Sequence, residues 1–471
     1  ELNKTQSIDV MDAVGSNIRI DSRGNEVMRI LPRLHEDVNE EWISDKTRYN
    51  YDGLLVNRLD RPWVKIKGKL VETSWEDAFL SVKNGLKGLN GSEISGIVGD
   101  LADMESMYSF KDLLNKLGSN SIECRQDGSQ VEAIPRAGYI FNSSISGIEN
   151  ADVCLLIGSN PRHEATLINT RLRKSVINGS LKVTRIGEEY DLTYPVNDLG
   201  NNTKIIAEII ENKHEFCIEL SNAKNPMIII GAGALNRVDG KAILASARAI
   251  AEQYNMVSDS WNGFNILQTA ASRVGGLDLG LTVTGGVEKI KKNAKEGKVK
   301  ALFLLGADEL DLSSFEDTFT IYVGSHGDNS ATKADVILPG AAFSEKSGLY
   351  TNTEGRLQLS EKAVFPPGEA KEDWTIFRAL SDILGVRLPY DNITELRDLI
   401  FQSDPTLGML DELTKASWVD FGKMGKIKGG KIKSSFQNYF TTNPIARNSN
   451  ILSDCKVMML DNGEEALVKN G

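Results

Sequence analysis

The feature that most constrains the fold of this chain is a series of short aliphatic runs that each end in glycine. These runs lie at Asp152–Gly158, Leu181–Gly187, Met227–Gly231 and Lys300–Gly306. Both faces of each run are apolar, which is typical of parallel strands buried between two layers of helices. Helices are expected at Met104–Leu117, Thr203–Ile210, Asp239–Tyr254 and Gly263–Val274. The alternation predicts an α/β fold with doubly wound parallel-sheet domains.

The two ends of the chain depart from this pattern. Strands are expected at Ser16–Ile20 and Glu26–Leu31, with a turn between them, which predicts a small N-terminal β-rich lobe. Glycine and lysine fill Lys423–Lys433, a composition that favours a mobile surface loop or linker. The tail Ser434–Gly471 is expected to pack on the body or on a partner. We therefore expect domains at 1–56, 57–390 and 391–471, in a chain cut from a longer one, since it opens without Met or a signal peptide.

Composition excludes several classes of function. The net charge of −11 argues against a nucleic-acid binder, which needs a basic face for phosphates, and against attachment to acidic lipid. No apolar run approaches the ~18–20 residues that cross a bilayer, so no direct membrane insertion is expected. The cysteines are few and widely spaced, at Cys124, Cys154, Cys217 and Cys455. Their spacing does not match a zinc or iron–sulfur site, and their scarcity fits a reducing compartment.

A first candidate binding site follows the strand Val153–Ile157 at once. Its sequence is Gly158-Ser159-Asn160-Pro161-Arg162. A strand, a glycine turn and a helix start can hold nucleotide phosphates, because the backbone approaches closely and the helix offers unpaired N–H groups. A plain strand-to-helix connection is the commoner origin of such a turn.

Other candidates are less specific. Gly306-Ala307-Asp308-Glu309 also follows a strand, but its two acids would repel a pyrophosphate. The stretches Ala334–Gly348 and Asn352–Arg356 are punctuated by glycine and rich in hydrogen-bonding side chains, as in loops that line a cleft. Among the four histidines, His326 is the most site-like, although a surface or capping role is favoured over catalysis.

Read together, these stretches resemble the molybdopterin oxidoreductase superfamily. Gly158–Pro161 matches its G-x-N-P turn, and Ala334–Pro339, Glu345–Gly348 and Asn352–Arg356 match its A-D-V-x-L-P, E-K-x-G and N-x-E-G-R segments. The resemblance is closer to one branch, the G subunit of respiratory complex I (NADH-quinone oxidoreductase). The segments similar to that branch are Ser7–Asn17, Val27–Arg33, Glu36–Lys46, Asp191–Tyr194 and Asn443–Arg447. The likeness covers nearly the whole chain in order.

Departures from the family pattern concern its cofactors. Active relatives begin this module with four cysteines that hold a [4Fe–4S] cluster, and the corresponding positions here are Asp9, Asp12, Ser16 and Ser44, with Gly15, Lys46 and Arg48 kept. Carboxylates and hydroxyls do not replace the thiolates that such clusters need. The resemblance therefore implies no metal or other cofactor in this segment, and a vestigial dinucleotide turn at Gly158, Ser159, Asn160 and Pro161. Cys124 lies roughly where relatives carry a molybdenum ligand, but an isolated cysteine is more often a core residue.

The resemblance implies a structural part of the G subunit. In the full-length subunit, 2Fe–2S and 4Fe–4S clusters in an N-terminal region, absent from this chain, would carry electrons from NADH toward quinone. The implied partners are the other peripheral-arm subunits of complex I. The implied location is the cytoplasmic face of a bacterial inner membrane or the matrix side of the mitochondrial inner membrane. Two alternatives stay open: an active molybdenum or tungsten bis-MGD oxidoreductase, similar to formate dehydrogenase, and a regulator that binds a small molecule or metal in the old cleft.

Overall fold

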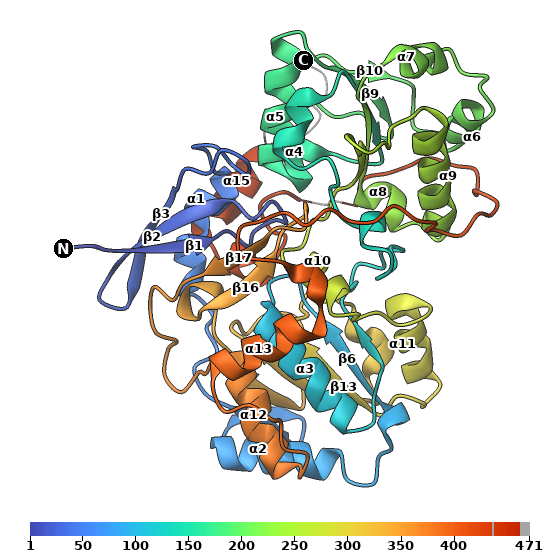
Figure 1. Cartoon of the computed structure of the whole chain (residues 1–471). Coiled ribbons are helices and arrows are strands. Elements are labelled where there is room, and N and C mark those ends of the chain that lie inside the picture. The colour runs from blue at the N-terminus through green and yellow to red at the C-terminus, as the bar shows by residue number, and fades with distance from the viewer. Residues whose placement is uncertain (436–437, 462–471) are drawn as a thin grey trace.

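The N-terminal lobe is a three-stranded antiparallel sheet in a computed structural model that describes residues 1–435 and 438–461. Its strands are β1 (Asn3–Ile8), β2 (Asn17–Arg23) and β3 (Glu26–Pro32). The two strands expected from sequence are present, and β1 was missed. Helix α1 (Asp45–Tyr49) follows, capped by the Ser44 side chain, which accepts from the Thr47 N–H. Figure 1 shows this lobe projecting from the side of the body.

A seven-stranded sheet forms the core of one α/β unit. Its order is β5-β4-β15-β14-β13-β6-β7, and β4 runs antiparallel to both of its neighbours, whereas the pairs from β15 to β7 are parallel. The strands are β4 (Trp63–Ile66), β5 (Lys69–Glu72), β6 (Ile94–Val98), β7 (Ile122–Glu123), β13 (Ala301–Leu305), β14 (Phe319–Gly324) and β15 (Val336–Pro339). Neighbouring residues of β13 supply opposite faces: Phe303 packs with Phe110 on one, and Leu304 belongs to a second apolar cluster on the other.

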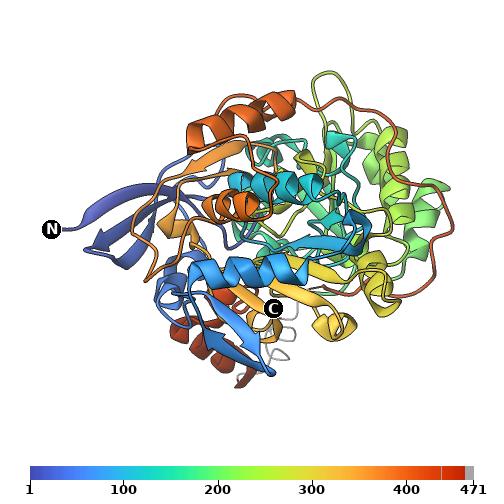
Figure 2. The ribbon, with the colours of Figure 1, turned by 90° about the horizontal axis from the view of Figure 1, so that it is seen from below.

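Helices cover both faces of this sheet, as the both-faces-apolar strands require. One layer contains α2 (Trp75–Gly85), α3 (Met104–Lys116) and α12 (Asp373–Ile383), with α13 (Ile393–Ser403) packed outside α3. The other face carries α11 (Gly286–Lys295), whose Val287 and Ile290 join the second cluster. Seen from below, α2, α3 and α12 lie over the sheet as one layer (Figure 2).

A second α/β unit contains five parallel strands in the order β10-β9-β8-β11-β12. They are β8 (Val153–Ile157), β9 (Lys182–Ile186), β10 (Asn197–Asp198), β11 (Pro226–Ile230) and β12 (Phe264–Ile266). The helices of this unit are α4 (Pro161–Glu164), α5 (Thr166–Ile177), α6 (Lys204–Ile210), α7 (Phe216–Asn222), α8 (Ala232–Leu235) and α9 (Gly240–Gln253). The expected doubly wound α/β fold is confirmed, because α5 and α9 contribute to the apolar clusters on opposite faces.

One predicted helix is wrong. Gly263–Val274 places apolar residues at helical spacing, but Phe264–Ile266 forms β12 and pairs with β11. Only Arg273 and Val274 belong to a helix, α10 (Arg273–Asp278). The hydrogen bonds that β12 makes with the neighbouring strand override local spacing in a segment buried on all sides.

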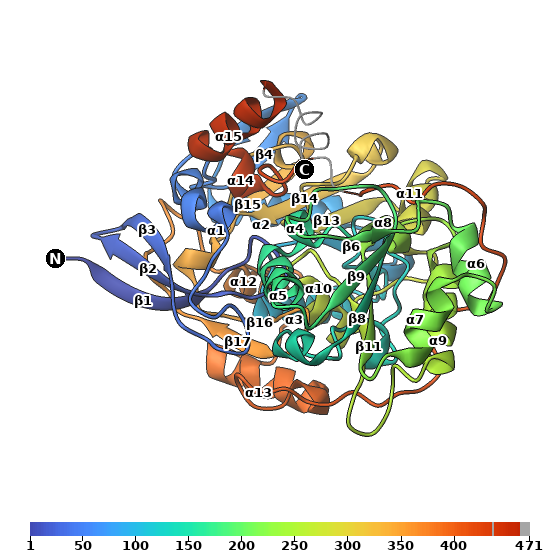
Figure 3. The same ribbon diagram turned by 90° about the horizontal axis from the view of Figure 1, so that it is seen from above.

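The last part of the chain runs back across both α/β units. After α13 it passes along the outside of the five-stranded unit, beside α6 and α9, and then returns to the N-terminal lobe (Figure 3). There it forms α14 (Pro444–Arg447) and α15 (Asn450–Asp461), which contact the 3-10 turn Asn50–Leu54. The hairpin β16 (Gly348–Thr351) and β17 (Leu357–Ser360) lies against β1 on the body side. Within the described residues, no helix is both long and apolar enough to span a membrane.

Candidate functional site

The first expected turn has the geometry of a phosphate-binding loop but is filled by the chain itself. β8 ends at Ile157, and Gly158 adopts a left-handed conformation with φ of 57°. A Cβ on Gly158 would lie 2.5 Å from the Ala234 amide nitrogen and 2.9 Å from Cγ2 of Ile432. The glycine therefore makes room for another part of this protein, at the place where α/β folds usually seat a ligand.

Acceptors rather than donors surround this turn. Ser159 donates from Oγ to Glu164 over 3.3 Å, and burial raises the pKa of Glu164 to about 7. Asn160 Oδ1 and Glu164 Oε1 are buried without a hydrogen-bond partner. Arg162, the cation next to the turn, is held by Asp191 at 2.8 Å. A phosphate would meet carbonyl and carboxylate oxygens here, which is unfavourable.

The second expected turn is occupied by a guanidinium. Asp308, Glu309 and Asp328 lie beyond the carboxyl ends of β13 and β14, and all three pair with Arg447 of α14. Arg447 Nε donates to Asp328 over 2.7 Å, and Nη2 donates to Asp308 over 2.5 Å. Asp308 also accepts from the Ser330 N–H over 2.7 Å. The acids that were expected to repel a phosphate at this turn are thus paired with a cation of the chain itself, Arg447.

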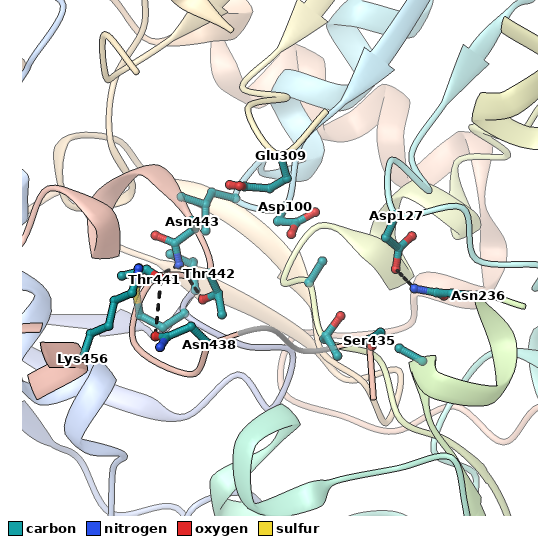
Figure 4. A pocket seen from close by; sticks show the side chains of 16 residues that line it. Asp100, Asp127, Asn236, Glu309, Ser435, Asn438, Thr441, Thr442, Asn443 and Lys456 are labelled. Carbon is teal, nitrogen blue, oxygen red and sulfur yellow. Dashed lines mark hydrogen bonds between the residues drawn. The ribbon is translucent and has the colours of Figure 1, made fainter. Parts of the chain in front are cut away.

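A cavity of about 550 Å³ is lined by Glu309 of the second turn, by Ala232 at the start of α8 and by residues of the C-terminal segment. Figure 4 shows Asp100 and Glu309 on the side of Asn443 of the C-terminal segment, whereas Asp127 lies against Asn236. These residues all line the cavity. Burial raises the pKa of Asp100. For Asp127 the effect of burial is outweighed by Arg273 together with hydrogen bonds from the Ser129 N–H and Asn236, which lower the pKa. The cavity therefore carries acidic groups close to a buried cation.

The four positions matching the cluster cysteines are buried in the N-terminal lobe, at Asp9, Asp12, Ser16 and Ser44. Asp9 accepts from the Met11 N–H over 3.2 Å, and Asp12 accepts from the Val14 N–H over 2.9 Å. The Asp9 N–H donates to the Ser16 carbonyl over 2.9 Å. The side chains of Asp9, Asp12 and Ser44 thus accept from local backbone N–H groups. Within the described residues no three His, Cys, Asp or Glu side chains are grouped to hold a metal ion.

Lys46 supplies the charge that balances this pair of acids. It is buried, and burial lowers its pKa although Asp12 and Asp9 raise it. Burial likewise raises the pKa of Asp12 and, with Asp12 nearby, raises that of Asp9 to about 7. The ammonium donates to Thr442 Oγ1 over 3.2 Å and lies 5.0 Å from the centre of the Tyr439 ring. This donor set of carboxylates, hydroxyls and a lysine does not fit an iron–sulfur cluster, which needs thiolates.

The glycine-punctuated stretches Ala334–Gly348 and Asn352–Arg356 contain a set of buried ion pairs. Lys346 pairs with Asp103 at 2.5 Å and with Asp373, both at helix N-termini. Arg356 Nε donates to Glu354 over 2.8 Å, and Arg58 Nη2 donates to Glu345 over 2.6 Å. The charged residues of this motif hold elements together.

Cys124 and His326, the two single residues considered as site candidates, are both buried. Cys124 is buried in the apolar core, its Sγ would lie 3.0 Å from a Cβ on Gly276, and burial raises the pKa of the thiol to about 12. Of the surface or capping role expected for His326, the surface position is wrong, because the ring is buried. Its Nε2 bonds to the Gly53 carbonyl over 2.8 Å, in the 3-10 turn Asn50–Leu54. Its buried setting lowers the pKa of this histidine to about 3, so it stays neutral.

The sequence did not predict the roles of two residues that shape the site, Ile432 and Arg447. Ile432 sits in a segment whose glycine and lysine content predicted a mobile loop, yet its side chain is 0% exposed, so that prediction is wrong for this part. Arg447 lies in a stretch that resembled the family but carried no assigned role. The only local signal at Ile432 is an apolar residue between two lysines, and Ile427 carries the same signal although it is only partly buried.

Family models match three successive parts of the chain. Residues 58–383 match molybdopterin oxidoreductase, and residues 412–455 match the C-terminal part of the G subunit of NADH-ubiquinone oxidoreductase. Residues 2–52 match a model described as NADH-ubiquinone oxidoreductase NDSU1/NuoG-like, 4Fe-4S domain. This last match is partly at odds with the expectation that the segment holds no cofactor.

Similar proteins share more than two fifths of their aligned residues with this chain. The G subunit of NADH-quinone oxidoreductase from Rickettsia bellii is 43% identical over 455 residues, 97% of this chain and 66% of the relative. The NADH-ubiquinone oxidoreductase 75 kDa subunit of Reclinomonas americana is 43% identical, covering 97% and 68%. The mitochondrial NADH dehydrogenase [ubiquinone] iron-sulfur protein 1 of Solanum tuberosum is 44% identical, covering 98% and 62%. The chain thus spans about two thirds of the length of these relatives.

Among solved structures, acetylene hydratase from Pelobacter acetylenicus superimposes with a TM-score of 0.59. The match covers 81% of this chain and 69% of that chain at 13% identity, which shows a shared fold.

Proposed function

The chain belongs to the molybdopterin oxidoreductase family, in the branch of the NADH-quinone oxidoreductase G subunit and the 75 kDa subunit, and from this premise we propose that it is a non-catalytic structural part of complex I. Its partners would be other subunits of the peripheral arm. Its location would be the cytoplasmic face of a bacterial inner membrane or the matrix side of the mitochondrial inner membrane. The 2Fe–2S and 4Fe–4S clusters that serve electron transfer from NADH to quinone would lie in a further region of the full-length protein.

The observation that carries this proposal is the chemistry at the four cluster positions. Asp9 and Asp12 accept backbone N–H groups and face the buried Lys46. Ser44 caps α1, which is a structural task. We propose that the lobe keeps the shape of a 4Fe-4S domain and replaces the cluster by a charge network. Its match to a 4Fe-4S domain then reflects ancestry of the lobe.

The two turns support the same proposal. Gly158–Pro161 would be a vestigial dinucleotide turn, because Ile432 takes the space beside Gly158. The alternative of an active molybdenum or tungsten enzyme is disfavoured by the burial of Cys124, which sits in the core with its thiol protonated. A regulatory role for the cavity has no specific observation in its favour.

Iron–sulfur reconstitution of the purified chain tests the proposal. The chain is incubated anaerobically with ferrous iron, sulfide and thiol, desalted, and measured for iron, acid-labile sulfide, molybdenum, tungsten and fluorescent pterin. We expect every content to be far below one equivalent, because no thiolate occurs at the four positions. A matched control is the variant with cysteine at Asp9, Asp12, Ser16 and Ser44, which offers the missing donors. About four iron atoms per unmodified chain would contradict the proposal.

The partnership is tested separately by affinity capture of the tagged chain co-expressed with the peripheral-arm subunits of a relative's complex I. Capture of these subunits in fixed stoichiometry is expected. Failure of the chain to recruit any of them, while a tagged full-length relative does, would contradict a structural role for this part.

A further inference from the structure

The C-terminal segment enters the first crevice with a buried aliphatic side chain. Ile432 is 0% exposed, and its Cγ2 lies within 4.0 Å of a Cβ placed on Gly158 or on Gly187. A Cβ on Gly233 would meet the Lys433 carbonyl at 2.5 Å. The glycines after β8, β9 and β11 therefore surround residues 432–433, at the carboxyl ends of three neighbouring parallel strands. That position is where open α/β sheets bind their ligands.

Hydrogen bonds to the main chain fasten the segment at Ile432 and in the residues before it. The Ile432 N–H donates to the Asn201 carbonyl over 2.8 Å, and the Thr203 N–H donates to the Gly430 carbonyl over 3.1 Å. Arg237 donates to the carbonyls of Lys428 and Lys431 over 3.0 Å each. Bonds to the main chain hold the segment in place independently of its lysine side chains.

The same segment reaches the second crevice and the N-terminal lobe. Arg447 lies among Asp308, Glu309 and Asp328 at the carboxyl ends of β13 and β14. Between the two crevices, Thr442 accepts from Lys46 of the lobe. One stretch of chain thus contacts the ligand-binding edge of both α/β units.

We propose that the described parts of residues 428–447, termed here the strap, are an internal substitute for a dinucleotide. The strap fills the first crevice with Ile432 and the second with Arg447, bridges the two α/β units, and closes both turns to phosphate ligands. This inference concerns the chain alone and does not depend on its assembly into complex I.

Hydrogen exchange on the full chain tests the strap, and the Thr203 N–H is its reporter because Gly430 is its acceptor. Ile432→Asp places a charge in the apolar socket, and we expect the peptide containing Thr203 to exchange about tenfold faster or more. Met424→Asp is the matched control, since Met424 lies in the same stretch but is 61% exposed. The control should exchange like the unmodified chain. Equal exchange in both variants would overturn the proposal.

Two measurements on the unmodified chain decide the matter even where Ile432→Asp does not fold. Amides of residues 430–433 should exchange more slowly than those of 424–426, and millimolar GDP should leave exchange at Gly158–Asn160 unchanged. Equally fast exchange of the two stretches would overturn the strap as a seated element. Protection of Gly158–Asn160 by GDP would show an open crevice and would overturn its role as a plug.

Discussion

At the scale of single residues, the charged side chains of the N-terminal lobe form a network of their own. Asp9, Asp12 and Lys46 are buried together. Burial raises the pKa of the two acids and lowers the pKa of the lysine, which in each case favours the neutral form. Proximity of the opposite charge opposes that shift, so the three groups depend on one another. Asp9, Asp12 and Lys46 thus form one buried electrostatic network in the lobe.

Removing the cation of this network should destabilise the chain. In Lys46→Met, two acids remain buried without their counter-charge, and we expect the free energy of unfolding to fall by about 3–5 kcal/mol. Urea unfolding at neutral pH measures the change. Lys69→Met, at an exposed position, is the control and should change the free energy by less than about 0.5 kcal/mol. Equal effects of the two substitutions would show that Lys46 has no such stabilising role.

Glu164 gives the chain a defined pH dependence. Burial raises its pKa from 4.5 to about 7 in the folded state, so its stabilising effect is full below pH 4.5 and is lost as pH rises through 7. The unmodified chain should therefore lose stability as Glu164 ionises, whereas Glu164→Gln should not. The free energy of unfolding of the variant relative to the unmodified chain should rise by on the order of 2–3 kcal/mol from pH 5 to pH 8. Urea unfolding at both pH values measures this difference. The exposed Glu361→Gln serves as the control, and a pH-independent difference for Glu164→Gln would contradict the assignment.

At the scale of elements, buried ion pairs join helices to one another and to a loop. Asp103 caps α3 and Asp373 begins α12, and Lys346 joins both of them from the loop before β16. Arg397 of α13 bonds to Glu105 of α3 over 2.6 Å. The family motif around Lys346 thus fixes the start of one helix layer on the seven-stranded sheet.

Loss of this junction should loosen both helix starts at once. Lys346→Met leaves Asp103 and Asp373 buried and facing one another, so we expect the free energy of unfolding to fall by about 3–5 kcal/mol. Hydrogen exchange should rise in the first turns of α3 and α12 while α9 stays protected. Lys371→Met, at an exposed position, is the matched control. Unchanged protection of both helix starts would contradict the role given to Lys346.

At the scale of the whole molecule, the N-terminal lobe is completed by the body. Its apolar cluster joins Ile18 and Ile30 of the lobe to Phe343 and Tyr350 of the body, and to Ile445 of α14. Two side chains of the body, Asn352 and Gln358, also donate to lobe carbonyls over 2.9 Å. The lobe is therefore a separate sheet without a separate core.

We expect an isolated fragment of residues 1–56 to be unfolded. Chains of this length bury only about 60% of their surface even when folded, and this one loses the partners of its core as well. Circular dichroism and thermal melting of the fragment measure the outcome, with the full chain as reference. A strand-type spectrum with a cooperative melting transition would contradict the expectation.

Local patterns were sufficient for most of the architecture. The both-faces-apolar runs at residues 153–157 and 301–305 became β8 and β13, because burial on two sides makes consecutive residues apolar. The turn at Gly158 was equally visible in a short stretch of sequence. The helix expected at 263–274 failed because pairing of β12 with β11 lies outside any local window.

The sequence by itself determined the family and the alternation of strands and helices. Tertiary structure alone decided what fills the crevices, since Ile432 and Arg447 reach strand ends far from them in the chain. The physical reason is the distance along the sequence over which each signal acts. Periodicity reports burial within one element. Packing and charge pairing between distant segments depend instead on how the whole chain folds back.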